Sequence, residues 1–414
     1  MAIRTIGIVG AGTMGAGIAQ VALEAGHDVL IHDADIRVVD RARERIRDGL
    51  SRRTQRLEVE PASIDGWVDE RLARLRPAMT IQDVAAASDL VVEAVIEDLA
   101  IKRALFRDLD EAAPREAILA TNTSALSVAA VAAETQRPDR VVGLHFFNPA
   151  PLMALVEVVV APATDPSIAD QATGLIEAWG KTPVRCTDSP GFIVNRVNRP
   201  FTLEGLALLE AGVGSLETID AAVRADGFPM GPFELMDLVG IDVNLAAARG
   251  VFEGFSYEPR FRPSEIQERL VEAGRLGRKT GEGFYWYGED GRRLGPAGAF
   301  AADAELVAAP GPAWSSLPSG EPGGEALDKL GPIVERIVLA IVNEAYWALG
   351  EDVASAGDID LALRLGAGHP SGPFERTAAL GGPAAVVVRL ERWQSAGPRF
   401  VPAPALLEAA RSLT

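Results

Sequence analysis

Residues 5–15 read TIGIVGAGTMG, and this stretch decides the fold of the chain. Its first five residues have the apolar character of a buried strand, and Gly10, Gly12 and Gly15 follow in the spacing G-x-G-x-x-G. The next residues, Ala16–Ala25, are apolar on one side, as in a helix that packs against a sheet. A glycine turn between a strand and a helix lets backbone N–H groups approach a pyrophosphate at the helix N-terminus. The stretch therefore predicts a nucleotide-binding strand–turn–helix unit.

An acidic residue after the second strand indicates which nucleotide binds. The predicted strand Asp28–His32 is followed by Asp33, 18 residues after Gly15, near the spacing of a carboxylate that bonds an adenosine ribose 2′-OH. Asp35 adds a second carboxylate, and both would repel a 2′-phosphate. Arg37 is the nearby residue that could soften this repulsion. We therefore expect NAD rather than NADP, with a purely structural turn as the alternative.

Composition excludes several classes of protein. The chain has 414 residues, 48% of them hydrophobic and 24% charged, which is typical of a soluble protein with two or three domains. The net charge of −18 argues against nucleic acid or an anionic membrane as a partner. No stretch of 18 apolar residues predicts a membrane span, and the chain enters a strand too early to leave room for a signal peptide.

The cysteine content indicates the cellular compartment, and the sequence lacks common metal-binding motifs. Cys186 has no second cysteine to pair with inside the chain, so we expect a reducing, cytoplasmic location. The spacings C-x-x-C and H-E-x-x-H do not occur, and we expect no metal site.

Strand and helix patterns alternate up to about residue 187, which is typical of a doubly wound parallel sheet, with an antiparallel pairing open for the last strands. The pattern becomes helical after Ser189-Pro190-Gly191. The predicted strands are Thr5–Val9, Asp28–His32, Leu90–Ala94, Ile118–Thr121, Val141–His145 and Leu155–Val160, and the predicted later helices are Phe192–Ala211, Leu216–Arg224 and Gly231–Arg249.

The second half of the chain contains an internal repeat. The motif Gly-Pro-Phe-Glu at 231–234 recurs at 372–375, and four residues before it recur at an offset of 140. Between the copies, residues 291–325 hold 12 Gly or Pro in 35 positions, as in a linker. The four outlying matches pair Arg196 with Arg336, Glu204 with Glu344, Ile219 with Ile359, and Asp220 with Asp360.

These patterns predict an α/β Rossmann-type domain followed by two tandem all-α domains. We place the NAD-binding domain at residues 1–187, the first helical copy at 188–290, the linker at 291–325 and the second helical copy at 326–414.

One histidine has the position of a catalytic group. His145 ends a predicted strand, and the carboxyl ends of strands face the ligand crevice in open α/β sheets. Glu157 lies inside the next predicted strand, where an unpaired carboxylate would be costly to bury. Pairing of the two strands would bring Glu157 to His145, where a carboxylate fixes the tautomer of a general base. The alternatives are a structural histidine and an exposed carboxylate on an edge strand.

Two further polar residues could contact a ligand. Ser124 closes the segment TNTS, which follows another predicted strand end, although such residues also cap helices. Asn195 lies one turn into the first helix of the helical half, where it is either a ligand contact or a surface residue.

Seven arginines fall between residues 41 and 56. Several alternate with acidic residues, as on a solvated helix face. Arg52, Arg53 and Arg56 have no acidic neighbour along the chain before Glu58, so they are the better candidates for binding the phosphates of an anionic substrate.

Together these segments resemble the L-3-hydroxyacyl-CoA dehydrogenases, the family that includes 3-hydroxybutyryl-CoA dehydrogenase. The matches occur in the family's order over about residues 1–290, and HFFNP at 145–149 and GFIVNR at 191–196 are specific. The repeat resembles long forms with two C-terminal domains. The other matching pieces are GAGTMG at 10–15, VEAVIE at 92–97, TNTS at 121–124, LVEV at 155–158, DSP at 188–190 and GRKTGEGFY at 277–285.

The resemblance implies a role for each matching residue. His145 corresponds to the family's catalytic base and Glu157 to its acidic partner, while Ser124 and Asn195 correspond to residues that hydrogen-bond the substrate near the reacting carbon. The implied cofactor contacts are Gly10, Gly12, Thr13, Met14 and Gly15 in the turn, Asp33 at the ribose, and Glu97, Lys102 and Asn122 on the nicotinamide side.

The implied activity is reversible, NAD-dependent oxidation of an L-3-hydroxyacyl-CoA in fatty-acid metabolism, including β-oxidation. The chain departs from the family at Ala154, where many members carry lysine, and in the CoA-binding hairpin near residues 40–75, where arginines replace lysines. A carrier-bound thioester, a small hydroxy or sugar acid, and an NAD-binding protein without activity are the alternatives.

The second helical copy has a structural explanation. At the repeat offset Asn195 corresponds to Glu335, so the catalytic-type asparagine is missing from the second copy. The apolar run Ile337–Val342 needs burial. We expect this copy to fold back on the first and form a pseudo-dimer within one chain, with a further homodimer left open.

Overall fold

The structure is a computed structural model that describes residues 3–300 and 331–412. The chain divides into two compact units, residues 1–192 and residues 193–414, and each is described by itself.

The first unit is built on one eight-stranded sheet with the order β3-β2-β1-β4-β5-β6-β7-β8. Every neighbouring pair is parallel except β6 and β7, which run antiparallel. The strands are β1 Thr5–Val9, β2 Asp28–His32, β3 Leu75–Pro77, β4 Leu90–Glu93, β5 Ile118–Thr121, β6 Val141–Phe146, β7 Leu155–Val160 and β8 Thr182–Thr187.

This topology confirms the predicted doubly wound sheet. The chain builds outward from β1 through β2 to β3, then returns to β4 on the other side of β1. The carboxyl ends of β1 and β4 therefore flank the point where the strand order reverses, which is where open α/β sheets bind ligands. The sequence analysis missed β3 and β8, the two outermost strands, because β3 has only three residues and β8 alternates with exposed polar residues.

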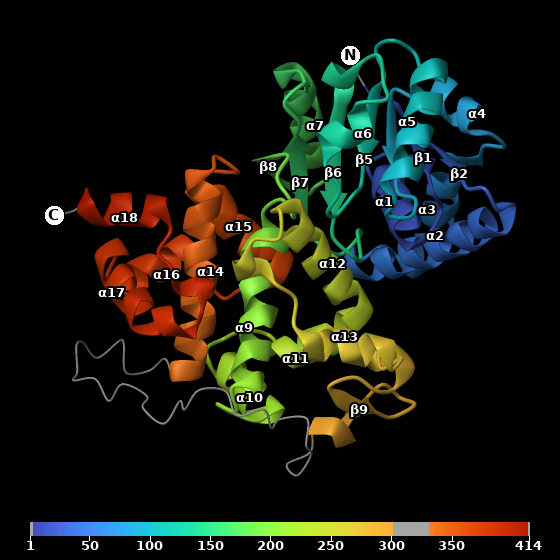
Figure 1. Cartoon of the computed structure of the whole chain (residues 1–414). Coiled ribbons are helices and arrows are strands. Elements are labelled where there is room, and N and C mark those ends of the chain that lie inside the picture. Colours follow the sequence, from blue (N-terminus) through green and yellow to red (C-terminus); the bar gives the residue numbers. More distant parts are fainter. Residues whose placement is uncertain (1–2, 301–330, 413–414) are drawn as a thin grey trace. The chain divides into compact units, whose positions relative to one another are not determined.

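Seven α-helices flank the sheet in the described part of this unit (Figure 1). Helices α1 and α7 pack on one face, whereas α4, α5 and α6 pack against the strands on the other. The helices are α1 Thr13–Glu24, α2 Ile36–Arg56, α3 Ile64–Leu72, α4 Ile81–Ala86, α5 Leu99–Ala112, α6 Val128–Ala132 and α7 Pro166–Ala178.

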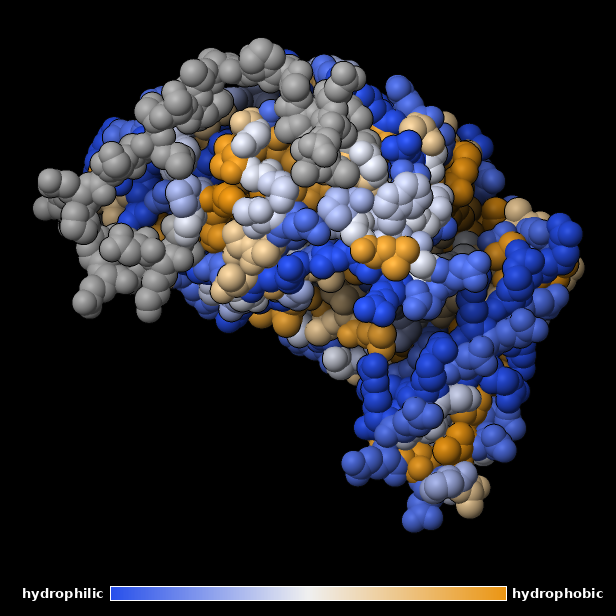
Figure 2. Space-filling view, turned by 90° about the horizontal axis from the view of Figure 1, so that it is seen from below, coloured by the Kyte–Doolittle hydropathy of each residue, from blue (hydrophilic) through white to orange (hydrophobic). Residues whose placement is uncertain are grey.

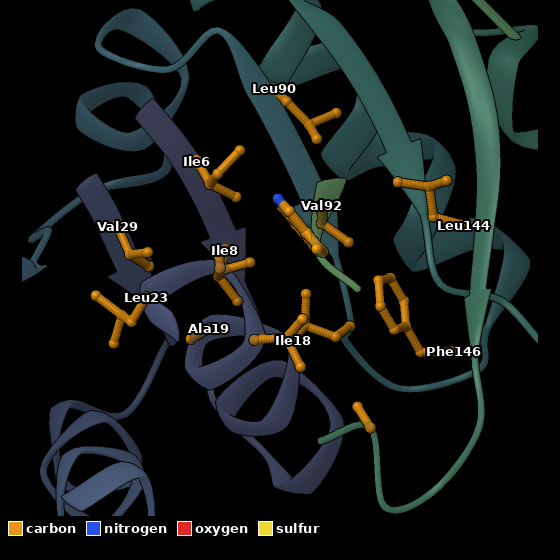
Figure 3. Packing of buried hydrophobic residues seen from close by; sticks show 14 of the residues in the cluster. Ile6, Ile8, Ile18, Ala19, Leu23, Val29, Leu90, Val92, Leu144 and Phe146 are labelled. Atoms are coloured by element: carbon orange, nitrogen blue, oxygen red, sulfur yellow. The ribbon is translucent and has the colours of Figure 1, made fainter. Parts of the chain in front are cut away.

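The core of this unit follows from the alternation of side chains along β1. Ile6 and Ile8 point to the face covered by α1, where they lie with Ile18, Ala19 and Leu23 of that helix (Figure 3). All five side chains are fully buried. Burial of each large apolar side chain contributes about 1.5–3 kcal/mol.

A glycine on the opposite face of β1 lets α4 approach closely. A Cβ on Gly7 would lie 2.5 Å from Cγ1 of Val84 in α4. Since a methyl group has no room there, the absence of a side chain at Gly7 determines how tightly the second layer packs.

The second unit is almost entirely helical. Its elements are α8 Val194–Val197, α9 Arg199–Glu210, α10 Leu216–Ala225, α11 Pro232–Val239, α12 Ile241–Gly254, α13 Glu265–Glu272, β9 Tyr285–Tyr287, β10 Arg293–Pro296, α14 Pro332–Gly350, α15 Ala356–Ala367, α16 Pro373–Ala379, α17 Pro383–Trp393 and α18 Pro404–Arg411.

Two helices expected as continuous are each divided. The segment 192–211 breaks at Asn198, because Pro200 cannot donate a backbone hydrogen bond and is placed in the first turn of a new helix. The segment 231–249 breaks at Gly240, whose φ of 103° lies outside the helical region.

The repeat seen in the sequence corresponds to a repeated structure. Asp220 in α10 accepts the backbone N–H groups of Phe233 and Glu234 at 3.0 and 3.3 Å. Asp360 in α15 does the same for the first turn of α16, with distances of 2.8 and 3.1 Å. The equivalent aspartate thus holds the start of the Gly-Pro-Phe-Glu helix in both copies.

Helix α9 of the first copy packs along α14 of the second. Arg196 contacts Glu344 at 2.8 Å between Nε and Oε1, and Arg336 contacts Oε1 of Glu204 through Nη2. Because these residues are partners at the 140-residue offset, each copy supplies the arginine of one pair and the glutamate of the other. This reciprocal exchange is the pattern of a two-fold interface. The apolar run 337–342 is buried.

The same exchange extends to a second pair of arginines. The short 3-10 turns Pro259–Phe261 and Pro398–Phe400 both read Pro-Arg-Phe. Arg260 places Nε 2.9 Å from Glu344, and Arg399 places Nη1 3.3 Å from Glu204. Each glutamate therefore contacts two arginines of the other copy.

Part of the expected linker has regular structure. Residues 293–296 form β10, which pairs antiparallel with β9. Residues 301–325 of the expected linker and the first residues of the expected last domain, 326–330, lie outside the described residues.

None of the helices that the structure describes is long and apolar enough to cross a membrane. On the face shown in Figure 2, hydrophobic residues are interspersed among hydrophilic ones.

Candidate active site

The three glycines of the turn after β1 have two different roles. Gly10 and Gly15 allow close packing of the protein, whereas Gly12 leaves space for a ligand. Gly10 has a φ of 97°, and a Cβ there would lie 2.5 Å from the carbonyl oxygen of Ala94. A Cβ on Gly15 would collide with the carbonyl oxygen of Gly10, so both glycines are required by the fold. A Cβ on Gly12 would meet no described protein atom within 4 Å. The open space at Gly12 fits a pyrophosphate placed against the start of α1.

Asp33 also supports this turn. Its carboxylate accepts the backbone N–H of Ala11 at 2.9 Å and that of Asp35 at 3.2 Å. The guanidinium of Arg37 binds the carboxylate of Asp35 through two nitrogens, at 2.8 to 3.1 Å. Arg37, the residue that could have softened the repulsion of a 2′-phosphate, is therefore engaged by a carboxylate. This geometry fits NAD.

The antiparallel pair β6–β7 brings a histidine and a carboxylate together. His145 and Glu157 lie directly opposite each other in the register of the two strands. Nδ1 of His145 is 2.5 Å from Oε2 of Glu157, and the two residues are 6% and 0% exposed. A carboxylate can only accept, so Nδ1 carries the proton and Nε2 has the lone pair of a general base.

Aromatic and amide groups hold the imidazole in this orientation. Phe147 lies 4.5 Å from the ring of His145 between centroids, and Phe192 lies at 5.7 Å. The side-chain oxygen of Asn122 accepts the backbone N–H of Phe146 at 2.8 Å, which ties the end of β5 to the end of β6. Asn122 therefore positions the strand that carries the histidine, in addition to the cofactor contact that the resemblance implies.

A cluster of charged side chains supports the segment that carries Ser124. Glu97 accepts hydrogen bonds from Oγ1 of Thr123 at 2.6 Å and from the backbone N–H of Ser124 at 2.9 Å. Burial raises the pKa of Glu97, but the charge of Lys102 and these hydrogen bonds outweigh that effect and hold the pKa below its usual value. Glu97 is therefore an anion at neutral pH, and it fixes the backbone at Ser124.

Lys102 lies between two carboxylates. Its Nζ is 2.6 Å from Oε1 of Glu93 and 3.2 Å from Oε2 of Glu97, and its side chain is 1% exposed. The Glu97 side chain is 37% exposed, so it is the member of this cluster that reaches solvent. Glu93, which also accepts the hydroxyl of Thr121 at 2.7 Å, was missed by the sequence analysis. The signal for it was a carboxylate in an otherwise apolar strand end.

The arginine-rich segment forms the long helix α2, which is followed by α3. Arg52 and Arg56 are exposed. Arg53 places Nε 3.3 Å from the carboxylate of Glu24 in α1, so it has an acidic neighbour that lies distant in the sequence. Arg47 similarly contacts Asp69 in α3 at 3.1 Å. Among the three candidates for binding substrate phosphates, Arg52 and Arg56 have no ion pair with any residue that the structure describes.

The remaining predicted site residue, Asn195, belongs to the second unit. It lies in α8 and is half-buried.

The other histidines have structural surroundings. His27 accepts the indole N–H of Trp179 at 2.8 Å, and burial lowers the pKa of its imidazole. Nδ1 of His32 is 3.1 Å from the carbonyl oxygen of Ala78. His369 lies beside Asn198, with 2.8 Å between Nε2 and Oδ1.

Two family models match the chain. The model described as "3-hydroxyacyl-CoA dehydrogenase, NAD binding domain" matches residues 5–189. The model described as "3-hydroxyacyl-CoA dehydrogenase, C-terminal domain" matches twice, at residues 191–287 and 331–409.

Similar proteins cover either the whole chain or its first part. The 3-hydroxyadipyl-CoA dehydrogenase of Escherichia coli K12 is 40% identical over 92% of this chain and 91% of its own length. The human mitochondrial hydroxyacyl-coenzyme A dehydrogenase is 40% identical over 69% of this chain and 91% of its own length.

Solved structures likewise match either the whole chain or about two thirds of it. The crystal structure of 3-hydroxybutyryl-CoA dehydrogenase from Escherichia coli K12 has a TM-score of 0.85 and 35% identity, with 100% of this chain and 99% of that chain covered. (S)-3-hydroxybutyryl-CoA dehydrogenase from Ralstonia eutropha has a TM-score of 0.66 and 36% identity, with coverage of 70% and 100%. The shorter relatives are thus matched almost completely by about two thirds of this chain.

Proposed function

The chain belongs to the 3-hydroxyacyl-CoA dehydrogenase family and is an NAD-dependent oxidoreductase, and we propose on this basis how its residues carry out the reaction. The substrate is an L-3-hydroxyacyl-CoA, and the product is the 3-ketoacyl-CoA. When bound, NAD accepts the hydride from C3 of the substrate. The chain itself binds and orients both molecules and moves one proton.

The contact between His145 and Glu157 is the observation that carries this mechanism. Nε2 of His145 takes the proton of the 3-hydroxyl group as the hydride leaves C3, and in the reverse direction the imidazolium returns that proton to the keto oxygen. The side chain of Glu157 stabilises the imidazolium through the bond of 2.5 Å to Nδ1. General base assistance of this kind contributes about 10²–10⁴-fold to the rate.

Ser124 and Asn195 are proposed to hydrogen-bond the substrate near C3. The support for Ser124 is the network through Glu97, which fixes its backbone beside the end of β5. The support for Asn195 is its place in the segment GFIVNR and its replacement by Glu335 in the second copy.

The turn Gly10–Gly15, which includes Thr13 and Met14, is proposed to hold the pyrophosphate, and Asp33 the adenosine ribose. Glu97 is proposed to face the nicotinamide, with Lys102 and Asn122 supporting that side. Arg52 and Arg56 are proposed to bind CoA phosphates, with Arg53 contributing from its contact with Glu24.

We propose a short-chain CoA thioester as the substrate. Its support is that the long relative is named for 3-hydroxyadipyl-CoA and the structure that covers the whole chain for 3-hydroxybutyryl-CoA. We place the enzyme in the cytoplasm, where Cys186 would stay reduced.

The second helical copy is proposed to take the place of a partner subunit. Its support is that the two copies exchange ion pairs. Glu344 of the second copy pairs with Arg196 of the first, and Glu204 of the first copy pairs with Arg336 of the second. A homodimer formed through other surfaces is compatible with this arrangement.

Turnover measurements test the proposed substrate class. The purified chain is assayed with NAD and either (S)-3-hydroxybutyryl-CoA, the same acyl group on an acyl carrier protein, or L-gulonate. We expect the largest kcat/KM for the CoA thioester. A larger value for the carrier-bound thioester or for gulonate would overturn the proposal.

A further inference from the structure

The helical unit contains a cavity where its two copies meet. The cavity has a volume of about 320 Å³, within the range of ~300–1,000 Å³ that is typical of small-molecule sites. It is lined by α9, by Pro259 and the residues after the turn 259–261 of the first copy, and by Pro398 and Arg399 of the second. None of the lining residues belongs to the proposed catalytic or cofactor-binding set.

The internal repeat shows what fills the equivalent place on the other side. At the offset of 140 residues, Ala207 of α9, which lines the cavity, corresponds to Trp347 of α14. Arg260 and Arg399 are equivalent residues of the two Pro-Arg-Phe turns. The guanidinium carbon of Arg260 lies 4.6 Å from the centre of the Trp347 ring. An indole ring therefore covers Arg260, whereas the equivalent position beside Arg399 carries only the methyl group of Ala207.

The guanidinium of Arg399 is held by contacts of its nitrogen atoms. Its Nε donates a hydrogen bond to the carbonyl oxygen of Arg260 at 2.9 Å, and its Nη1 is 3.3 Å from Oε2 of Glu204. Among the residues that the structure describes, no aromatic ring lies over this guanidinium. A planar ring that enters the cavity can stack on Arg399 as the indole of Trp347 stacks on Arg260.

A second arginine gives the cavity a positive charge that the other side lacks. Arg262 lines the cavity, is exposed, and forms no ion pair within the described part of the chain. The residue that follows the turn in the second copy is Val401. Glu210 is the carboxylate of the lining, and its Oε1 accepts the hydroxyl of Ser264 at 2.5 Å. The free guanidinium of Arg262 can therefore bind a carboxylate or phosphate.

We propose that this cavity binds a small molecule that has a planar aromatic ring and a negatively charged group. The ring stacks on Arg399, and the anionic group pairs with Arg262. The ligand thus takes the place that Trp347 occupies in the second copy. Because both copies line the cavity, a bound ligand also stabilises the folded pair of copies.

Indole-3-acetate is the probe that tests this site, because it combines the ring of tryptophan with one carboxylate. Its binding to the full chain is followed by a ligand-detected NMR titration, with saturating NAD present to occupy the proposed cofactor site. We expect one site with a Kd of about 1 mM or lower, and an unfolding temperature that rises with the probe concentration. Indole-3-ethanol, which lacks the carboxylate, should bind about 2- to 5-fold more weakly.

Variants that introduce residues of the second copy locate the site. Ala207→Trp fills the cavity with the protein's own indole and should abolish binding of the probe. Ala221→Trp adds the same side chain at an exposed position of α10 and should leave binding unchanged. Arg262→Val should remove the difference between indole-3-acetate and indole-3-ethanol. Because Arg262 is exposed, this variant tests the site even where Ala207→Trp does not fold, which thermal unfolding reports.

Three results would overturn the inference. The first is that the unmodified chain does not bind indole-3-acetate. The second is that folded Ala207→Trp binds it as well as the unmodified chain does, or that Ala221→Trp loses binding equally. The third is that Arg262→Val keeps the full preference for the carboxylate. None of these measurements requires turnover, so the inference is tested independently of the proposed function.

Discussion

At the scale of single residues, the site depends on a carboxylate that is buried against an imidazole. Glu157 is fully buried, and the ionised form of such a group needs a charged or hydrogen-bonded partner. His145 supplies that partner from the neighbouring strand. The contact with His145 lowers the free-energy cost of burying Glu157, and the same contact orients the proposed base.

Substitution of His145 tests its role. His145→Ala should leave the affinity for NAD unchanged and lower kcat by at least ~10²-fold. Glu157→Gln should be milder but still severe, with a displaced pH profile, because it weakens the stabilisation of the imidazolium. Steady-state kinetics and a cofactor titration measure both effects. His27→Ala, which removes a structural histidine of the same unit, is the control, and near-normal turnover of His145→Ala would remove this residue from the mechanism.

Cofactor choice is also determined by individual residues. Asp33 should make NAD strongly preferred, because a 2′-phosphate would face its carboxylate. Asp33→Ala should reduce that preference and also weaken NAD binding, since it removes the acceptor of the Ala11 N–H. Asp35→Ala should release Arg37 and raise kcat/KM for NADP. Comparable kcat/KM values for the two cofactors in the unmodified enzyme would contradict this account.

At the scale of elements, the segment between α15 and α16 is held by a neutral histidine. His369 is buried beside Asn198, which joins α8 to α9. Burial, with a smaller effect from the charge of Arg376, lowers the pKa of His369 to about 3. Its counterpart in the first copy is Phe228, so an aromatic ring fits both positions.

This histidine should make the stability of the chain depend on pH. Between the unperturbed pKa of 6.5 and the folded value of about 3, the unfolded chain binds a proton that the folded chain does not. Stability should therefore fall as the pH decreases below 6.5, by roughly 2 kcal/mol from pH 7 to pH 5. His369→Phe should remove this contribution. Denaturant unfolding at several pH values measures it, and an unchanged pH dependence in the variant would show that His369 is not its source.

At the scale of the whole molecule, the two helical copies depend on each other for their buried charges. Glu344 is buried with Arg196 and Arg260 of the first copy, and Glu204 with Arg336 and Arg399 of the second. Loss of one partner from a buried pair typically costs about 3–5 kcal/mol. Removal of either copy would therefore leave uncompensated charges and an exposed apolar helix face in the other.

Truncation after residue 290 should expose this face. We expect aggregation or a new dimer, which size-exclusion chromatography with light scattering would detect against the full chain. A truncated protein that stays soluble, fully active and unchanged in oligomeric state would rule out the pseudo-dimer.

The sequence by itself determined the features that depend on neighbours along the chain. The strand, the glycine turn and Asp33 lie within 29 residues, and their spacing predicted a nucleotide-binding unit and NAD. The alternation of strand and helix patterns up to about residue 187 predicted the doubly wound sheet. His145 and Glu157 could be paired because a short turn joins their strands. The repeat was visible because both copies keep the same arginine, glutamate and aspartate.

Only the tertiary structure decided which charges meet across long separations. Arg53 was taken to have no acidic neighbour, yet Glu24 of another helix lies beside it. Glu93 belongs to the site because the chain after β4 folds so that Lys102 of α5 lies next to its carboxylate. Spacing along a chain sets local geometry, whereas the compensation of a buried charge depends on packing between distant segments, which no local pattern records.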